Sequence, residues 1–197
     1  MNIDTVVFDI GAVLVDWDPH LAWIDELGID EAKAFLARIK FDKINLACDA
    51  GARFADADIS DPDDAARLAS YAARFSQTVP NKIKGTWAIL HELRDANVPL
   101  HAITNWSAET WPEGVKAHPE LGQVFGETIV SGEVGMIKPS VEIFRLLCKR
   151  VEIAPERCVF IDDGLHNCLG AKAAGMDAIH FTSPEALRPA LKARGLL

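Results

Sequence analysis

The chain has 197 residues, with 29 Asp and Glu against 20 Lys and Arg, and its formal net charge at neutral pH is −9. This length suits one domain or a core with a small insert, and the 49% share of hydrophobic residues supports a buried core and argues against disorder. The acidic surplus disfavours nucleic acid and anionic membranes as partners, because both are bound mainly through Lys and Arg. It does not exclude a small anionic substrate, and it suits a cation.

The first residues lack the basic start and the long apolar stretch of a signal peptide, and no later stretch reaches the roughly 18 apolar residues of a membrane span. The cysteines form no CxxC pair; they are Cys48, Cys148, Cys158 and Cys168. A disulfide or a zinc site is conceivable, but reduced structural thiols fit this spacing better. We therefore expect a cytoplasmic protein. Its oligomeric state is not readable from the sequence.

Short apolar segments along the chain predict strands, and most of them end in polar residues or a glycine. The predicted strands are 6–8, which is followed by Asp9 and Gly11; 100–103, followed by Thr104 and Asn105; 128–130, followed by Ser131 and Gly132; 158–161, followed by Asp162 and Asp163; and 177–181. Helical spacing of apolar residues separates them, at 83–93, at 141–151 after the candidate N-cap Ser140, and at 167–175 with Gly175 in a C-cap position.

Strands that alternate with helices predict an α/β fold, a Rossmann-like parallel sheet with helices on both faces. Residues 18–80 differ, because they show helical stretches at 21–27, 31–39 and 65–75, several aspartates, and no strand pattern. We interpret 18–80 as a small all-helical cap inserted after the first strand, and 1–17 with 81–197 as the core. Ligands of such sheets bind at the carboxyl ends of the strands, where the polar residues lie.

These polar residues form an ordered set of four motifs. They are Phe8-Asp9-Ile10-Gly11-Ala12-Val13-Leu14, Ile103-Thr104-Asn105, Lys138-Pro139, and Phe160-Ile161-Asp162-Asp163-Gly164 with Asn167. In this order the chain resembles the haloacid dehalogenase (HAD) superfamily of hydrolases, and within it the phosphatases with a small helical cap. Each motif alone is weak, since a strand-end aspartate or threonine and a surface lysine are common.

The resemblance implies a role for each motif. Asp9 would attack phosphorus and form an aspartyl-phosphate. Asp9, Asp162, Asp163 and the Gly11 carbonyl would hold Mg²⁺, which prefers oxygen ligands. The phosphate-binding residues would be Thr104, the backbone N–H of Asn105, and Lys138, with Thr104 and Lys138 also counted as catalytic. Asn167 would orient its neighbours or cap its helix.

Gly11 departs from the family pattern, because the phosphatases usually carry a second Asp there as general acid and base. Such a group contributes about 10²–10⁴-fold to the rate. A more acidic leaving group would need less protonation, and the sequence is similar to bacterial phosphatases that share the Asp-x-Gly opening and act on sugar 1-phosphates. Alternatively another acid could reach in, the candidates being Asp16, Asp18, Asp42, Asp49 and His166, or catalysis could be vestigial. We favour the leaving-group explanation.

Substrate choice is expected from the cap and the loops that face it. Trp17, Trp106 and Trp111 could form sugar-stacking walls, and Phe41, Asp42, Asn45 and Asp49 could contact hydroxyl groups. A core position or a solvated helix face is the ordinary alternative for each of them.

The predicted function is hydrolysis of a small phosphorylated metabolite, with Mg²⁺ as cofactor. A metal-independent 2-haloacid dehalogenase is the alternative within the same fold, although the pair Asp162 and Asp163 disfavours it. A catalytically weak regulatory or binding member of the fold is the third possibility.

Overall fold

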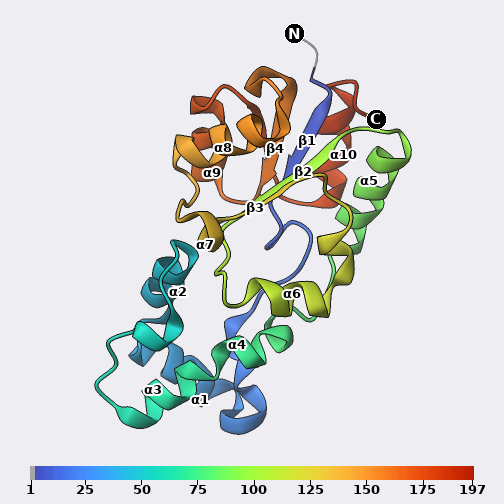
Figure 1. Cartoon of the computed structure of the whole chain (residues 1–197). Coiled ribbons are helices and arrows are strands. Elements are labelled where there is room, and N and C mark those ends of the chain that lie inside the picture. The colour runs from blue at the N-terminus through green and yellow to red at the C-terminus, as the bar shows by residue number, and fades with distance from the viewer. Residues whose placement is uncertain (1–2) are drawn as a thin grey trace.

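The computed structural model describes residues 3–197, and its centre is a single parallel sheet of five strands in the order β3-β2-β1-β4-β5 (Figure 1). The strands are β1 (Thr5–Phe8), β2 (Leu100–Thr104), β3 (Thr128–Val130), β4 (Cys158–Asp162) and β5 (Asp177–His180). All five predicted strands are confirmed. Because β1 lies at the centre, with later strands added on both sides, the strand order reverses at its carboxyl end, which is where sheets of this kind bind ligands.

Alternate residues of the central strand face opposite sides of the sheet, and both sides are buried. Val6 and Phe8 belong to one hydrophobic cluster, and Val7 belongs to a second. The first cluster includes residues of α5 (Lys84–Asp95) and α10 (Pro184–Lys192), and the second includes residues of α8 (Val141–Val151) and α9 (Leu165–Ala173), so helices cover both faces (Figure 1). Burial on both faces explains why the strands read as continuous apolar runs.

The chain between β1 and α5 is helical, and none of residues 18–80 belongs to a strand. These helices lie beyond the carboxyl ends of the strands (Figure 1). They are η1 (Pro19–Ala22), α1 (Ile24–Arg38), α2 (Phe41–Asp49), η2 (Phe54–Asp56), α3 (Pro62–Ala69), α4 (Tyr71–Arg74) and η3 (Phe75–Thr78). The remaining short helices of the chain are α6 (Trp111–Ala117), η4 (Pro119–Gly122), α7 (Ser131–Val134) and η5 (Pro155–Arg157).

Helix boundaries in the insert differ from the sequence expectation. The predicted helix at 21–27 is a 3₁₀ turn followed by the start of α1, which Gly28 interrupts with φ +73°. The predicted helix at 65–75 divides at Ser70 into α3 and α4. Helix α2 was not predicted; it begins after Lys40, whose left-handed φ of 56° separates it from α1. This omission matters, because α2 faces the site.

Aromatic side chains hold the insert together and join it to the core. The Trp23 and Tyr71 rings stack with their centroids 5.4 Å apart, and the Phe75 ring packs against Trp106 of the core with a centroid distance of 5.2 Å. One hydrophobic cluster runs from the sheet into the insert without a break. The division at 18 and 80 therefore stays a prediction.

Two other sequence expectations concern the whole chain. The four cysteines are free and buried, as expected for structural thiols. Within residues 3–197 no helix combines the length and apolar character that a membrane crossing requires.

Ser140 precedes α8 as predicted, but its hydroxyl donates to the Glu142 carboxylate instead of capping the helix.

Gly170 allows α9 to lie against the loop that carries Lys138. A Cβ at this position would collide with the Pro139 backbone and come within 2.9 Å of the Pro139 Cβ. We expect Gly170→Ala to lower the free energy of unfolding by about 1–3 kcal/mol, as overpacking does, although alanine favours an isolated helix. Urea denaturation measures this, with Lys172→Ala on the exposed side of α9 as the control. Equal stability of the two variants would contradict the assignment.

Candidate active site

Residues predicted to be catalytic and residues predicted to bind metal meet at the carboxyl edge of the sheet. Asp9 follows β1, Thr104 ends β2 and Asp162 ends β4. Their side chains are buried, with exposed fractions of 7%, 1% and 0%. The Asp9 N–H donates to the Ile161 carbonyl at 2.8 Å, so strand pairing continues to the carboxylate and fixes its position.

Lys138 lies between two of these carboxylates. Its Nζ is 2.8 Å from Asp9 Oδ1 and 2.6 Å from Asp162 Oδ2, and the residue is only 3% exposed. Asn105 holds the lysine backbone from the next strand end, because its Oδ1 accepts from the Lys138 N–H at 2.8 Å and its Nδ2 donates to the Lys138 carbonyl at 3.2 Å. Three strand ends and the loop before α8 thus form one hydrogen-bonded unit.

Burial and charge act in opposite directions on this unit. Burial lowers the pKa of Lys138, but the charges of Asp9 and Asp162 outweigh it, and the net pKa is raised. Burial raises the pKa of Asp9 to about 7, against the lowering effect of Lys138. The lysine stays charged, and a further cation beside Asp9 would lower the pKa of this carboxyl again.

Asp162 is oriented by three donors. Besides Lys138, the Gly164 N–H donates to its Oδ1 at 2.7 Å and Asn167 Nδ2 donates to the same oxygen at 2.9 Å. The hydrogen bond to Asp162 supports the orienting role predicted for Asn167. The Asn167 side chain does not cap α9, whose N-cap residue is Gly164. These bonds use three of the roughly four acceptor positions of a carboxylate.

Asp9, Asp162 and Asp163 each place an oxygen within 4.8 Å of the others. Such an oxygen cluster fits a hard cation such as Mg²⁺. Asp9 Oδ1 already accepts from the Ile10 N–H at 2.7 Å and from Lys138. Asp163 is exposed at the protein surface, but protein atoms partly desolvate its carboxyl group, and this desolvation and the charge of Asp162 raise the pKa of Asp163. Asp9 and Asp163 are therefore the members with acceptor capacity to spare.

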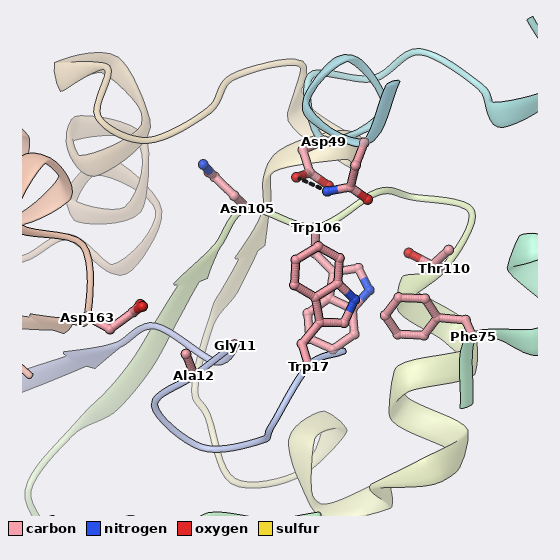
Figure 2. A pocket seen from close by; sticks show the side chains of 10 residues that line it. Gly11, Ala12, Trp17, Asp49, Phe75, Asn105, Trp106, Thr110 and Asp163 are labelled. Carbon is pink, nitrogen blue, oxygen red and sulfur yellow. Dashed lines mark hydrogen bonds between the residues drawn. The ribbon is translucent and has the colours of Figure 1, made fainter. Parts of the chain in front are cut away.

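A pocket of about 280 Å³ opens beside this cluster, between the strand ends and the insert (Figure 2). Its lining residues come from both parts of the chain: Gly11, Ala12, Trp17, Asn45, Asp49, Phe75, Asn105, Trp106, Thr110 and Asp163. The sequence did not single out Phe75 or Thr110 for this role. Neither residue belongs to a sequence motif, and they reach the pocket wall only because η3 and the start of α6 pack against each other.

Several substrate-binding predictions are placed on the pocket wall by the structure. Trp17 is 42% exposed, and its Nε1 donates to the Tyr71 hydroxyl at 3.3 Å, which orients the ring. Trp106 lines the same pocket with its ring largely buried. Asn45 and Asp49 line the pocket from α2, joined by a hydrogen bond of 3.0 Å from Asn45 Nδ2 to Asp49 Oδ2. Figure 2 shows Asp49 at this wall.

Two of the predicted cap residues do not reach this pocket. Phe41 is 2% exposed and stacks edge-on against Tyr71 at 5.0 Å, so it is a core residue of the insert. Asp42 is exposed and lies outside the pocket lining. Phe41, Asn45 and Asp49 are spaced four apart along α2, so the difference lies along the helix: Phe41 begins α2 and packs into the insert, whereas Asn45 and Asp49 lie further along it and line the pocket.

Removing the buried cation tests the charge arrangement. Lys138→Met would leave Asp9 and Asp162 facing each other, and breaking a buried pair costs about 3–5 kcal/mol. We expect the free energy of unfolding in EDTA at pH 8 to fall by about this amount, as measured in urea. Part of the loss should return at pH 5, because protonation of Asp9, whose pKa burial already raises, removes one of the facing charges. Lys149→Met, on the exposed side of α8, is the control, and equal stabilities would refute the arrangement.

Comparison with known proteins gives a family. The model of the haloacid dehalogenase-like hydrolases matches residues 3–175. A sesquiterpene phosphatase, astK, of Aspergillus oryzae is 30% identical over 95 residues, which are 48% of each chain. The fructose-1-phosphate phosphatase YqaB of Escherichia coli is 31% identical over 78 residues, which are 40% of this chain and 42% of the relative. The alignments therefore cover about half the length of these curated relatives.

Solved structures agree on the fold. The HAD family enzyme bt-2542 of Bacteroides thetaiotaomicron superposes with a TM-score of 0.73 at 21% identity, over 93% of this chain and 95% of that one. At this identity the likeness establishes the architecture alone. The family match over residues 3–175 shows that the chain belongs to the haloacid dehalogenase-like hydrolases.

Proposed function

We propose that this protein is a Mg²⁺-dependent phosphohydrolase that cleaves small phosphate monoesters through an aspartyl-phosphate on Asp9. The observation that carries the proposal is the buried unit of Asp9, Lys138 and Asp162 beside the exposed carboxylate of Asp163, at the mouth of a pocket. A carboxylate held this way is placed for attack, and the neighbouring lysine attracts a phosphate. The phosphatase names of the relatives support the same reaction class.

Asp9 is the nucleophile in this proposal. A carboxylate oxygen of Asp9 forms a bond to phosphorus while the bond from phosphorus to the ester oxygen breaks, and the leaving oxygen keeps the electron pair. Water then attacks the aspartyl-phosphate, which releases phosphate and restores Asp9. The covalent intermediate divides one difficult displacement into two easier ones.

Lys138 and the end of β2 bind the phosphate group in the proposal. Thr104 and the backbone N–H of Asn105 donate to its oxygens, and Lys138 offsets the charge that develops on it. Asp162 positions the lysine, since it takes hydrogen bonds from Lys138, Gly164 and Asn167.

The proposed magnesium ligands are Asp9, the Gly11 carbonyl and Asp163, with Asp162 completing the acidic cluster. Mg²⁺, when bound, supplies positive charge that draws phosphate oxygens toward the nucleophile. Without that charge, the carboxylates repel both one another and the substrate. Gly11 and Asp163 line the pocket, so both are accessible from the side on which substrate enters.

Phosphate release from a panel of phosphorylated metabolites, with Mg²⁺ and with EDTA, measures this activity. We expect EDTA to abolish turnover, added Mg²⁺ to restore it, and Asp9→Asn to lower kcat by ~10³-fold or more, as loss of a nucleophile does. Asp58→Asn, an exposed position of the insert outside the pocket, is the control for a lost carboxylate. Turnover of Asp9→Asn at the wild-type rate would contradict the nucleophile.

Two rival functions give different results in the same assays. A 2-haloacid dehalogenase would release chloride from 2-chloropropionate in EDTA and would release no phosphate. A binding or regulatory member of the fold would hold a phosphorylated ligand without turnover, and equilibrium binding would detect it.

We further propose that the substrate is a sugar phosphate and that residues 18–80 act as a cap over it. The pocket presents one exposed aromatic ring, Trp17, opposite polar groups on α2, namely Asn45 and Asp49. Sugars offer this combination of an apolar face and hydroxyl groups, and Trp rings provide flat apolar walls with a polar edge. A sugar 1-phosphate is one member of the class, and the E. coli relative bears the name of a fructose-1-phosphate phosphatase.

Truncation of the Trp17 ring tests the sugar-binding wall. Aromatic contacts contribute roughly 0.5–1.5 kcal/mol beyond area burial, so we expect Trp17→Ala to raise KM for a sugar phosphate about fivefold to tenfold. The KM for acetyl phosphate, which has no ring to stack, should change by less than about twofold, and Trp17→Phe should keep most of the sugar affinity. An equal rise of KM for both substrates would show that the ring shapes the site and does not read the sugar.

A further inference from the structure

The core of this site holds no proton donor where related phosphatases carry one. Gly11 occupies the position two residues after the proposed nucleophile, and it lines the pocket without a side chain. Crowding does not explain the absence of a side chain at position 11, because a Cβ on Gly11 would have nothing within 4 Å. Departure of an ester oxygen without a proton forfeits the roughly 10²–10⁴-fold that a general acid contributes. A carboxyl elsewhere on the pocket wall could supply it.

Asp49 is a carboxyl in that wall that is both buried and turned to the pocket. It is the last residue of α2, is 8% exposed, and lines the same pocket as Gly11 and Asp163 (Figure 2). Asn45 donates to its Oδ2 at 3.0 Å, which leaves Oδ1 free of that bond. Within residues 3–197 no Lys, Arg or His forms an ion pair with Asp49. No hydrogen-bonded cation therefore holds it in the charged form.

The segment that carries Asp49 is fixed to the core. The Phe54 N–H donates to Glu109 Oε2 at 2.8 Å, just before α6. Directly after α2, a Cβ on Gly51 would lie 3.5 Å from the Gly132 carbonyl oxygen and 3.8 Å from the Gly135 Cα, so the backbone there lies close to α7. These two contacts hold the C-terminal end of α2, where Asp49 lies, next to α7, which directly follows β3.

We propose that Asp49 is the general acid and base that replaces the carboxyl missing at Gly11. The inference rests on the proposed phosphatase activity. As Asp9 attacks phosphorus and the ester bond breaks, the Asp49 O–H gives its proton to the leaving oxygen, which departs as a neutral alcohol. The Asp49 carboxylate then takes a proton from the water that attacks the aspartyl-phosphate. Both groups return to their starting forms when phosphate leaves.

The electrostatic surroundings of Asp49 suit both halves of this cycle. Burial raises the pKa of Asp49 to about 7, against the opposing effects of the Lys138 charge and a backbone hydrogen bond from Ser107. Tyr71 and Cys48 are its other titratable neighbours, and burial raises the pKa of each, so both stay neutral near pH 7. A carboxyl that is roughly half protonated at working pH can donate and accept a proton.

The other acids considered from the sequence are not placed for this role. Asp16, Asp42 and His166 are exposed and lie outside the pocket lining. Asp18 is also outside it and accepts from the His20 ring at 2.6 Å. With Asp49 as the acid, the site does not require an unusually good leaving group, and this replaces our sequence-based preference for that explanation.

Two aryl phosphates of similar shape test the proposal. The leaving group of 4-nitrophenyl phosphate needs little protonation, whereas phenol departs from phenyl phosphate as a much stronger base. We expect Asp49→Asn to lower kcat/KM for phenyl phosphate ~10²-fold or more and for 4-nitrophenyl phosphate by less than about threefold. Because kcat/KM covers only the steps through departure of the alcohol, loss of the base in the second step does not obscure the comparison. Asp58→Asn should change neither value.

The pH profile gives a second readout. For wild type, kcat/KM on phenyl phosphate should fall as pH rises through about 7, because the acid loses its proton. Asp49→Asn should lack this fall, and Asp49→Glu should keep it. Asp49→Asn should also melt no lower than wild type at pH 8, because at that pH it removes an unfavourable buried charge. Folding failure is thereby separated from loss of the acid.

The outcomes separate this proposal from the proposed function. If wild type releases phosphate from no substrate, or if Asp9→Asn is as active as wild type, the phosphatase assignment fails. If those tests succeed but Asp49→Asn slows both aryl phosphates equally, or neither, Asp49 is not the acid and the inference is overturned. The same follows if Gly11→Asp in the wild-type background speeds phenyl phosphate hydrolysis ~10²-fold, since the site then lacked a donor.

Discussion

The contact of Lys138 with Asp9 and Asp162 is the constraint on which the rest of the site depends. A buried ammonium or carboxylate is costly unless it is paired and hydrogen-bonded. Lys138 Nζ lies 2.8 Å from the Asp9 carboxylate and 2.6 Å from that of Asp162, and all three residues have exposed fractions below 10%. The contact forms only when the ends of β1 and β4 and the loop before α8 are all correctly placed, because each of them supplies one of the three groups. Fold and charge arrangement are therefore not separable at this edge of the sheet.

The strand ends could be predicted from the sequence because two physical signals coincide there. A strand buried on both faces must be apolar throughout, so Val6, Val7 and Phe8 stand out, and the first polar group after them marks the carboxyl edge. The same logic located Thr104 and Asp162. The ordered motifs then indicated the family, which the match over residues 3–175 confirms.

The pocket wall could not be predicted in the same way, because it depends on tertiary contacts. Helix α2 has only nine residues, and Phe41 marks the aromatic core of the insert where we expected a substrate contact. Once α2 is placed, the spacing from Asn45 to Asp49 puts both on one face. Sequence spacing identifies such pairs but does not say which face meets the pocket.

Part of the net charge of −9 is concentrated at this site. Asp9, Asp162 and Asp163 bring three carboxylates near one lysine, so the strand ends by themselves repel a phosphate, and a dication is what reverses the sign. A fourth carboxylate in the same pocket would oppose this unless it were neutral. The buried position of Asp49, without a paired cation, favours its protonated form, so the condition that lets it serve as an acid is also the one that lets an anionic substrate approach.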